Sequence, residues 1–454
     1  MSKIIKLKKG FDIKLVGQAE KKLANTPQPE TFALKPTDFI GIKRPKVLVN
    51  VGDNVKAGTP ILIDKKQNSV LHTAPVSGEI VDIRRGEKRS LLEIVILADK
   101  TTEYLDFKKS SPSQIASINK DEAKEQILNS GIWPYILQRP YGIIANPDEI
   151  PRDIFISGFD THPLAPDYDF MYKNDGASFQ AGIDILKKFT DGAVHLSTRA
   201  EVEVPAVFKQ VTGVERHEFK GPHPAGNVGI QIHHINPIRK GDLVWTLNPF
   251  GVILIGRLFL EGRYNTSKLM ALVGSEVKVP QYYQTYIGAC INKYVENNII
   301  EGNVRCISGN VLTGRKISKD GYVGYYDHMV TVIPEGDYYE MFGWIKPTSN
   351  RLSFHRAVGL FSFLNPNKEY VLDTNTRGEE RPFVQSGVFE KVLPMDILPV
   401  HLLKSILAED YDGMEGLGIY ELVEEDVALC EFVDVSKHDV QAILRVGLEL
   451  LREG

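Results

Sequence analysis

Histidines form the densest group of side chains in this sequence that could do chemistry. Four of the eleven lie close together, at His217, His223, His233 and His234. A metal site needs two or three converging ligands, and His217-Glu218 has no second histidine four residues after the first. Neighbouring histidines on a strand, as we expect for 233 and 234, point to opposite faces. The sequence therefore predicts core or interface histidines and no metal ligands.

Motifs that hold redox cofactors or activate a serine are absent as well. No glycine-rich phosphate loop follows a predicted strand, and the glycines at 413–418 come in the wrong order for one. Cys290, Cys306 and Cys430 lack iron–sulfur spacing, so we expect buried apolar side chains. No G-x-S-x-G elbow is present. The sequence predicts no cofactor bound by this chain, and a nucleotide in a sheet crevice stays the alternative.

The composition is that of an ordinary globular protein. Of 454 residues, 43% are hydrophobic and 25% are charged, which excludes a disordered, collagen-like or coiled-coil chain. The 54 Lys and Arg against 58 Asp and Glu give a net charge of −4, which disfavours nucleic acid as a partner. The apolar run 250–256 ends at Arg257, too early to span a membrane, and no secretory signal begins the chain. We expect a multidomain cytoplasmic protein.

The first hundred residues predict short strands. Gly-Asp and Ala-Pro turns interrupt alternating hydrophobic residues at 49–61 and 74–83. This pattern resembles the biotinyl/lipoyl carrier fold, so we assign residues 1–100 to a barrel-sandwich hybrid. In carriers a modified lysine lies seven residues before the alanine of the second turn, and Gln67 holds that place here. We therefore expect a carrier-like module without a swinging arm.

Residues 101–260 predict a Rossmann-like α/β domain. Asn119 can cap a helix that Gly131 ends. A buried strand at 153–158, a helix at 177–189 and a strand at 193–197 form a right-handed crossover in a doubly wound sheet. Such sheets bind ligands outside the carboxyl ends of their strands.

Two further units complete a multidomain α/β fold. Predicted strands at 268–273 and 277–286 and a helix at 289–297 indicate a β-grasp domain over 261–330, which resembles the soluble-ligand-binding β-grasp (SLBB) family. Helical periodicity at 402–407 and 439–451 predicts a C-terminal helical domain. We assign 331–454 to a connecting segment and that domain.

Short strings spread along the chain match a known family. They are KKGFD (8–12), DKK (64–66) before TAP (73–75), RGEKR (85–89), DTHPL (160–164), GPHPAG (221–226), FGWI (342–345) and LCEFV (429–433). They resemble the A subunit of the sodium-translocating NADH:quinone reductase (Na+-NQR). The architecture is also similar to the C subunit of the Rnf complex and to the NADH-binding flavoprotein subunit of complex I. Both of those carry cluster-binding cysteines that this sequence lacks.

The resemblance implies a peripheral subunit on the cytoplasmic side of the bacterial inner membrane. Its six-subunit complex would couple NADH oxidation and quinone reduction to Na+ export. FAD, FMN, riboflavin and iron–sulfur centres would belong to other subunits, while this chain docks the complex and is inactive alone. A scaffold subunit of an Rnf-type complex and a membrane-fusion adaptor are the alternatives.

The family also implies a quinone near two segments, which correspond here to residues 34–42 and 136–143. The candidate quinone-binding residues are Phe39, Ile40, Arg44, Arg139 and Tyr141. The aromatic and aliphatic members could flank an apolar ring, and the arginines could hydrogen-bond a carbonyl oxygen as it gains charge. The alternative is that the two aromatic residues only pack in the core or at an interface.

Overall fold

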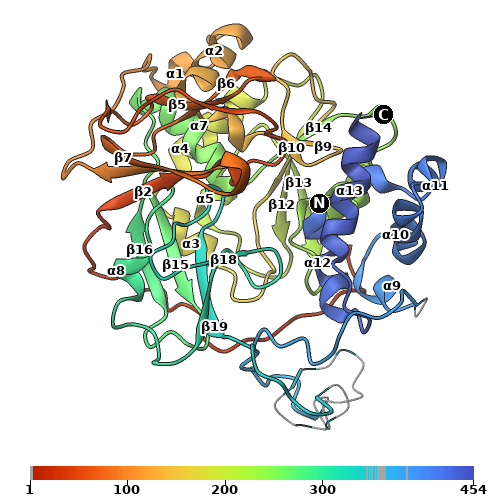
Figure 1. Ribbon diagram of the computed structural model, residues 1–454. Coiled ribbons are helices and arrows are strands. Elements are labelled where there is room, and N and C mark those ends of the chain that lie inside the picture. The colour runs from red at the N-terminus through yellow and green to blue at the C-terminus, as the bar shows by residue number, and fades with distance from the viewer. Residues whose placement is uncertain are drawn as a thin grey trace.

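The structure is a computed structural model that describes residues 4–343, 346, 348, 351, 352, 354, 364–384 and 387–453. Trp344 and Ile345 of the FGWI string lie outside these described residues. The described residues form four β-sheets and the helices that pack on them (Figure 1).

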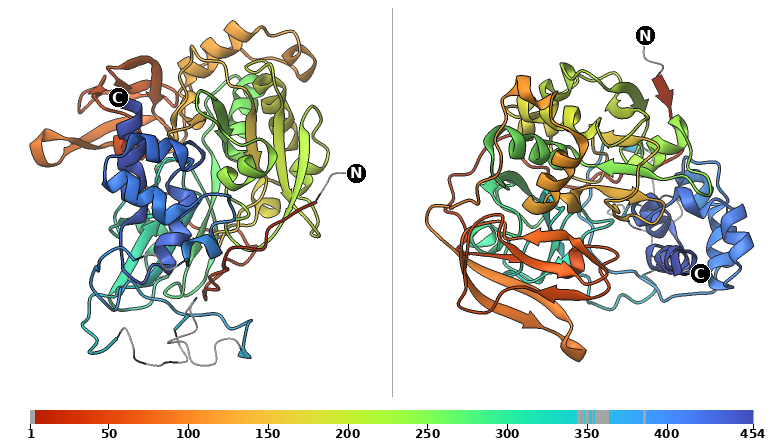
Figure 2. Two further views of the ribbon diagram at one scale, coloured as in Figure 1. Left: turned by 90° about the vertical axis from the view of Figure 1, so that its right-hand side faces the viewer. Right: turned by 90° about the horizontal axis from the view of Figure 1, so that it is seen from above.

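The largest sheet has seven strands. Their spatial order is β1 (Ile4–Lys6), β13 (Glu215–Lys220), β12 (Val194–Arg199), β11 (Ile154–Ser157), β14 (Val244–Leu247), β9 (Leu137–Arg139) and β10 (Ile143–Ile144). The first five are parallel, and β9 and β10 continue the sheet antiparallel. Figure 2 shows β1, next to the N-terminus, at the edge of this sheet.

Helices cover both faces of this sheet. They are α1 (Pro112–Ile115), α2 (Lys120–Ser130), α3 (Tyr168–Tyr172), α4 (Gly176–Leu186), α5 (Ala206–Lys209), α6 (Val228–Ile235) and α7 (Pro249–Glu261). The chain runs from β11 through α4 to β12 and then to β13, in one direction across the sheet. It returns from β13 through α6 to β14, on the other side of β11. Because both crossovers are right-handed, α4 and α6 lie on opposite faces. The direction of strand order therefore reverses at β11 and β14.

Two smaller sheets form the barrel-sandwich hybrid. One has the order β2 (Thr31–Leu34), β8 (Leu91–Ala98), β7 (Gly78–Arg85) and β4 (Asn54–Val55); the other has β3 (Pro45–Val47), β5 (Pro60–Asp64) and β6 (Gln67–Thr73). Their buried aliphatic residues include Ile61, Ile80 and Ile94. Gln67 begins β6 and its amide lies 3.4 Å from the Ala145 carbonyl, so this hairpin rests on the neighbouring domain.

The fourth sheet carries the SLBB-like domain. Its order is β16 (Gln281–Thr285), β15 (Lys268–Val273), β19 (Met329–Pro334), β17 (Val304–Ser308) and β18 (Arg315–Ile317), with α8 (Asn292–Val295) beside it. The C-terminal helices are α9 (Phe389–Val392), α10 (Pro399–Leu407), α11 (Tyr411–Gly416), α12 (Glu424–Val433) and α13 (Val440–Glu453). They pack together on one side of the molecule (Figure 1). Among the described residues, no helix has the length and hydropathy needed to cross a membrane.

Several predicted elements are confirmed and two are wrong. The Asn119 side chain accepts the Glu122 N–H at the start of α2, and Gly131 ends it with a left-handed φ of 81°. The helix expected at 289–297 is only the short α8, because Ala289 and Cys290 form β-bridges to other parts of the chain. Residues 233 and 234 lie on α6 and not on a strand. Their segment must cross back over the sheet, which overrides the β-branched composition.

The domain boundaries at 100, 260 and 330 stay predictions. One buried apolar cluster includes residues from all four predicted units. In addition, β1 pairs with β13, and β19 extends to Pro334.

Gly182 of α4 and Gly256 of α7 let the two helices approach closely, and Gly256 allows a sharp test of this packing. A Cβ on Gly256 of α7 would lie 1.7 Å from the Ser178 carbonyl oxygen. We expect Gly256→Ala to destabilise the protein by about 1–3 kcal/mol, since this overlap outweighs a helix-propensity gain of about 0.5–1 kcal/mol. Gly176→Ala is the control, because nothing lies within 4 Å of its added Cβ. Urea unfolding measures both, and equal effects would contradict the close packing.

Candidate functional site

A cavity of about 500 Å³ lies at the carboxyl ends of β11 and β14. Ligands bind at this place in open α/β sheets. The connections that follow the two neighbouring strands lead to opposite faces of the sheet, and a crevice opens between them. Its volume is within the usual range for ligand sites. Its lining residues include Ile40, Tyr135, Leu137, Arg139, Ser157, Phe159, Asp160, His162, Tyr168, Asn227, Val228, Leu247, Arg315, Tyr326, Glu424, Glu425 and Gln441.

The loop after β11 places an ion pair in this crevice. The Asp160 Oδ1 atom lies 2.6 Å from His162 Nδ1, and both side chains are mostly buried. Burial opposes charge on each group, but their attraction and hydrogen bond outweigh it. The pKa of His162 is therefore raised and the pKa of Asp160 is lowered. Both shifts favour the charged forms of the pair.

A second histidine beside this pair stays neutral. The His223 ring lies 4.8 Å from the His162 ring, and its Nδ1 is 3.1 Å from the Thr161 hydroxyl. Burial, followed by the His162 charge, lowers the pKa of His223 to about 3. The two neighbouring imidazoles therefore have pKa values shifted in opposite directions.

The N-terminal end of α12 covers the crevice with carboxylates. Arg139, on β9, donates to Glu425 and to Asp426, each at 2.6 Å. Arg445 donates to Glu424 at 2.6 Å. The carboxylates at this helix end are also favoured by the helix dipole. The residues that cover the crevice are therefore acidic, but the two arginines balance most of their negative charge.

Buried polar atoms around the crevice have unused hydrogen-bonding capacity. They are His162 Nε2, His223 Nε2, Asn227 Oδ1, Gln231 Oε1 and Asp426 Oδ1, which have no hydrogen-bond partner among the described residues. Most buried polar atoms in proteins are paired, so a concentration of unpaired ones calls for a ligand or water. Donors and acceptors are both present, which suits a small polar group better than a bare ion.

The structure brings two of the five sequence-predicted residues into the crevice, Ile40 and Arg139. Phe39 is 2% exposed and packs 4.8 Å from the Tyr325 ring. The Tyr141 side chain is half-buried, 6.4 Å from the Tyr420 ring. Arg44 is exposed and is held through its backbone N–H, which donates to Asp64 at 3.1 Å.

The histidines that are close in sequence are spread across the fold. His233 pairs with Glu421 at 2.7 Å, and His234 Nε2 is 2.8 Å from the Pro394 carbonyl oxygen, so both form an interface with the C-terminal region. His217 lies on β13, and His223 lies beside His162, which lines the crevice. Sequence reasoning missed the acidic cover. The acidic run at 424–426 before an apolar segment signals the start of a helix, but it does not show that this helix end covers the crevice.

Family models match three parts of the chain. They are described as "NqrA N-terminal barrel-sandwich hybrid domain" at 5–99, "NqrA second alpha/beta domain" at 118–264 and "NQRA C-terminal domain" at 269–319. A solved NAD+-reducing [NiFe]-hydrogenase in the H2-reduced state is 10% identical, covering 75% of this chain and 62% of its own. Its TM-score of 0.38 is too low to carry an argument.

Curated relatives match along nearly the whole chain. The A subunit of the Na(+)-translocating NADH-quinone reductase of Neisseria meningitidis is 37% identical, covering 99% of this chain and all of its own. The proteins of the same name from Rhodopirellula baltica and Yersinia pestis are 36% and 37% identical. They cover 99% and 97% of this chain, and 99% and 98% of their own.

Replacing Arg139 tests how strongly the acidic cover depends on it. Arg139→Met leaves the fully buried Asp426 carboxylate without its cation, so we expect a loss of about 3–5 kcal/mol in unfolding free energy. Arg44→Ala, which removes an exposed arginine, changes stability by less than about 0.5 kcal/mol. Denaturant unfolding compares the two. Similar small effects would show that Arg139 is not a structural ion-pair residue.

The Asp160–His162 pair predicts a pH dependence that NMR can follow. Asp160→Asn keeps an acceptor for the His162 N–H but removes the charge, so burial then lowers the pKa of His162. The stability that wild type gains from raising this pKa is complete below the ordinary histidine pKa of about 6.5 and lost as pH rises through the raised value. The gain from Asp160 is lost as pH falls from about 3.9 through its lowered pKa. An unchanged His162 titration in the variant contradicts the pairing.

Proposed function

Because the chain belongs to the NqrA family, the A subunits of the Na(+)-translocating NADH-quinone reductase, we propose that it docks that complex and holds quinone in the crevice above β11 and β14. The complex is an NADH:quinone oxidoreductase, and this chain is one of its several subunits. Membership in this family sets aside the Rnf scaffold and the membrane-fusion adaptor.

One observation carries the quinone proposal. The two segments implied by the family resemblance, 34–42 and 136–143, are about a hundred residues apart in sequence yet contribute Ile40 and Arg139 to the same cavity. An apolar wall and a few polar groups are what a quinone ring with two carbonyl oxygens requires. The proposal rests on this meeting of segments and not on either segment alone.

The charges of the crevice favour a neutral ligand over a nucleotide. A pyrophosphate would have to compete with the crevice carboxylates for His162, Arg139 and Arg445, which those carboxylates already engage. The sequence offers no glycine loop to cradle phosphate. Quinone carries no charge before reduction, so it avoids this cost.

The candidate residues then take different roles. Ile40 forms part of the apolar wall, and Arg139 is a positioning residue, because its two terminal nitrogens hold Glu425 and Asp426 in place at the edge of the cavity. Phe39 is a positioning residue, since its ring packs 6.1 Å from that of Tyr326, which lines the cavity. The Tyr141 carbonyl accepts from Arg445 at 2.7 Å and so supports the Glu424 pair.

Arg44 faces solvent, where it would meet a quinone presented by another subunit. We further propose that the chain is a peripheral subunit on the cytoplasmic side of the bacterial inner membrane, in a complex of six subunits. It would carry no redox cofactor, leaving FAD, FMN, riboflavin and iron–sulfur centres to its partners. It would be inactive alone, as the lack of cofactor motifs in its sequence supports.

Calorimetric titration of the purified chain with a soluble short-chain quinone tests the site. Ile40→Ala removes apolar wall, so we expect binding to weaken about tenfold, equivalent to about 1.4 kcal/mol. Leu48→Ala is a matched control, because Leu48 is 40% exposed against 37% for Ile40 and does not line the cavity.

Equal affinities for wild type and both variants would place the quinone elsewhere. Failure of the folded wild-type chain to bind, alone and within the assembled complex, would remove the quinone role. Neither result would change the family to which the chain belongs.

A further inference from the structure

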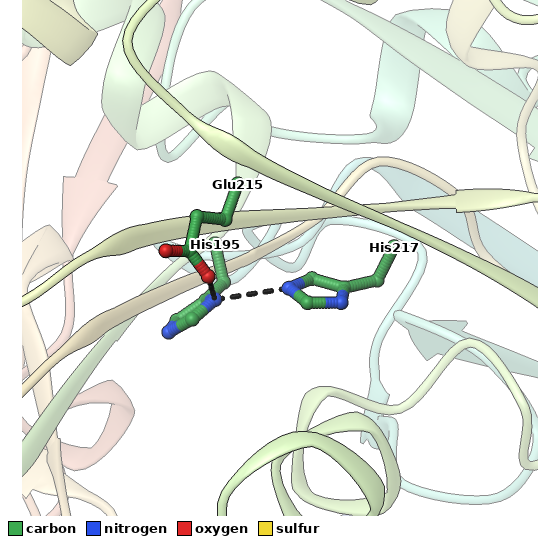
Figure 3. A group of neighbouring side chains, drawn as sticks. All are labelled: His195, Glu215 and His217. Atoms are coloured by element: carbon green, nitrogen blue, oxygen red, sulfur yellow. Dashed lines mark hydrogen bonds and ion pairs between the residues drawn. The ribbon is translucent and has the colours of Figure 1, made fainter. Parts of the chain in front are cut away.

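Three potential metal ligands converge on neighbouring strands of the large sheet. His195 lies on β12, while Glu215 and His217 lie on β13. The register places His195 opposite Glu215 and Ser197 opposite His217. Residues two apart on a strand share a face, so the three side chains point to the same side. Figure 3 shows their ring nitrogens and carboxylate turned toward one point.

The distances fit a coordination sphere. His195 Nδ1 lies 3.0 Å from His217 Nε2 and 3.5 Å from Glu215 Oε2, and the three ligand atoms are all within 4.8 Å of one another. A tetrahedral ion with bonds of about 2.0–2.1 Å separates its ligands by roughly 3.3 Å. Small rotations of two partly exposed side chains would bring the set to that spacing.

The buried histidine is held in the orientation that a metal ligand needs. Its other ring nitrogen, Nε2, faces the Asp153 carboxylate at 3.6 Å, and the ring stacks on Phe155 at 4.5 Å. Asp153 is itself fixed by Arg152 at 2.8 Å and by the Ala193 N–H at 3.1 Å. A carboxylate behind a ligating histidine is the usual outer-shell partner in metal sites.

No placement of protons on the two histidines gives all three side chains a hydrogen-bond partner within the group. The Asp153 charge favours a proton on His195 Nε2, which leaves a lone pair on Nδ1. His217 can donate to that lone pair, but the Glu215 carboxylate then faces a nitrogen that has no proton to offer. A cation between the three groups removes the mismatch.

We propose that His195, Glu215 and His217 bind a divalent transition-metal ion such as Zn2+. Two imidazoles and one carboxylate suit such ions, whereas Mg2+ and Ca2+ prefer oxygen ligands alone. The Glu215 side chain is 64% exposed, so water completes the coordination. The search for a second histidine close to His217 in the sequence missed this set, because His195 lies on the neighbouring strand.

The site lies at the opposite end of the sheet from the crevice. His195 and Glu215 are at the amino-terminal ends of β12 and β13, while the crevice is at the carboxyl ends of β11 and β14. A metal ion here would fasten β13 to β12 and take no part in quinone binding. The inference is therefore independent of the proposed function.

Equilibrium dialysis of the chelator-treated full-length chain against Zn2+ tests the proposal. We expect one ion per chain, with Glu215→Gln and His217→Gln each weakening binding at least tenfold. Asp153→Asn should weaken it by about 10- to 100-fold through the histidine it orients. His401→Gln, which alters an exposed histidine on α10, is the control and should leave the affinity unchanged.

Co2+ provides a second readout, because tetrahedral coordination gives intense visible absorption. The bands should appear with wild type and with His401→Gln, and disappear with Glu215→Gln and His217→Gln. Addition of the metal ion should raise the thermal unfolding midpoint of wild type and of His401→Gln, and leave that of Glu215→Gln and His217→Gln unchanged. This measurement requires only that the variants fold. Equal Zn2+ affinity in wild type and in both ligand variants would overturn the site. So would adventitious Zn2+ binding only, or the displacement of bound Zn2+ by an equimolar amount of Na+.

Discussion

The buried ion pairs of Arg139 connect the α/β domain to the C-terminal helices at the crevice. Its guanidinium joins β9 to α12 across 287 residues of sequence, and Asp426 is fully buried. The same place is crowded from a third side, because a Cβ on Gly229 of α6 would lie 2.4 Å from both Arg139 and Asp426 atoms. A buried charge without its partner is strongly destabilising, so the sheet, the crossover helix and the C-terminal helices are constrained to meet there.

This constraint also sets the chemistry of the crevice. Carboxylates at the start of α12 occupy the side from which a Rossmann-like sheet would otherwise receive phosphate. The arginines neutralise much of their charge but are engaged by it, which leaves few cations for an anionic ligand. Among the remaining polar groups, Asn227 is neutral and His162 is already paired with Asp160. An apolar ring with carbonyl oxygens is physically compatible with such a site.

Local structure was the part most readily predicted from sequence. The cap at Asn119, the left-handed end at Gly131 and the strand at 153–158 depend on neighbouring residues, and all are confirmed. The candidate site was predicted less completely. Ile40 and Arg139 line one cavity, but Phe39 supports it from behind, and Arg44 lies outside. Side-chain direction and burial depend on distant packing, which a segment does not encode by itself.

Sequence alone therefore determined the kinds of domain in this protein, the absence of cofactor motifs and the family, because turn chemistry, hydrophobic period and characteristic strings are local. Only tertiary structure decided that Glu425 and Asp426 would face Arg139, and that His195 would meet Glu215 and His217. In both cases the partners lie on different elements. Their contact depends on strand order and helix placement, which are fixed by burying the shared core.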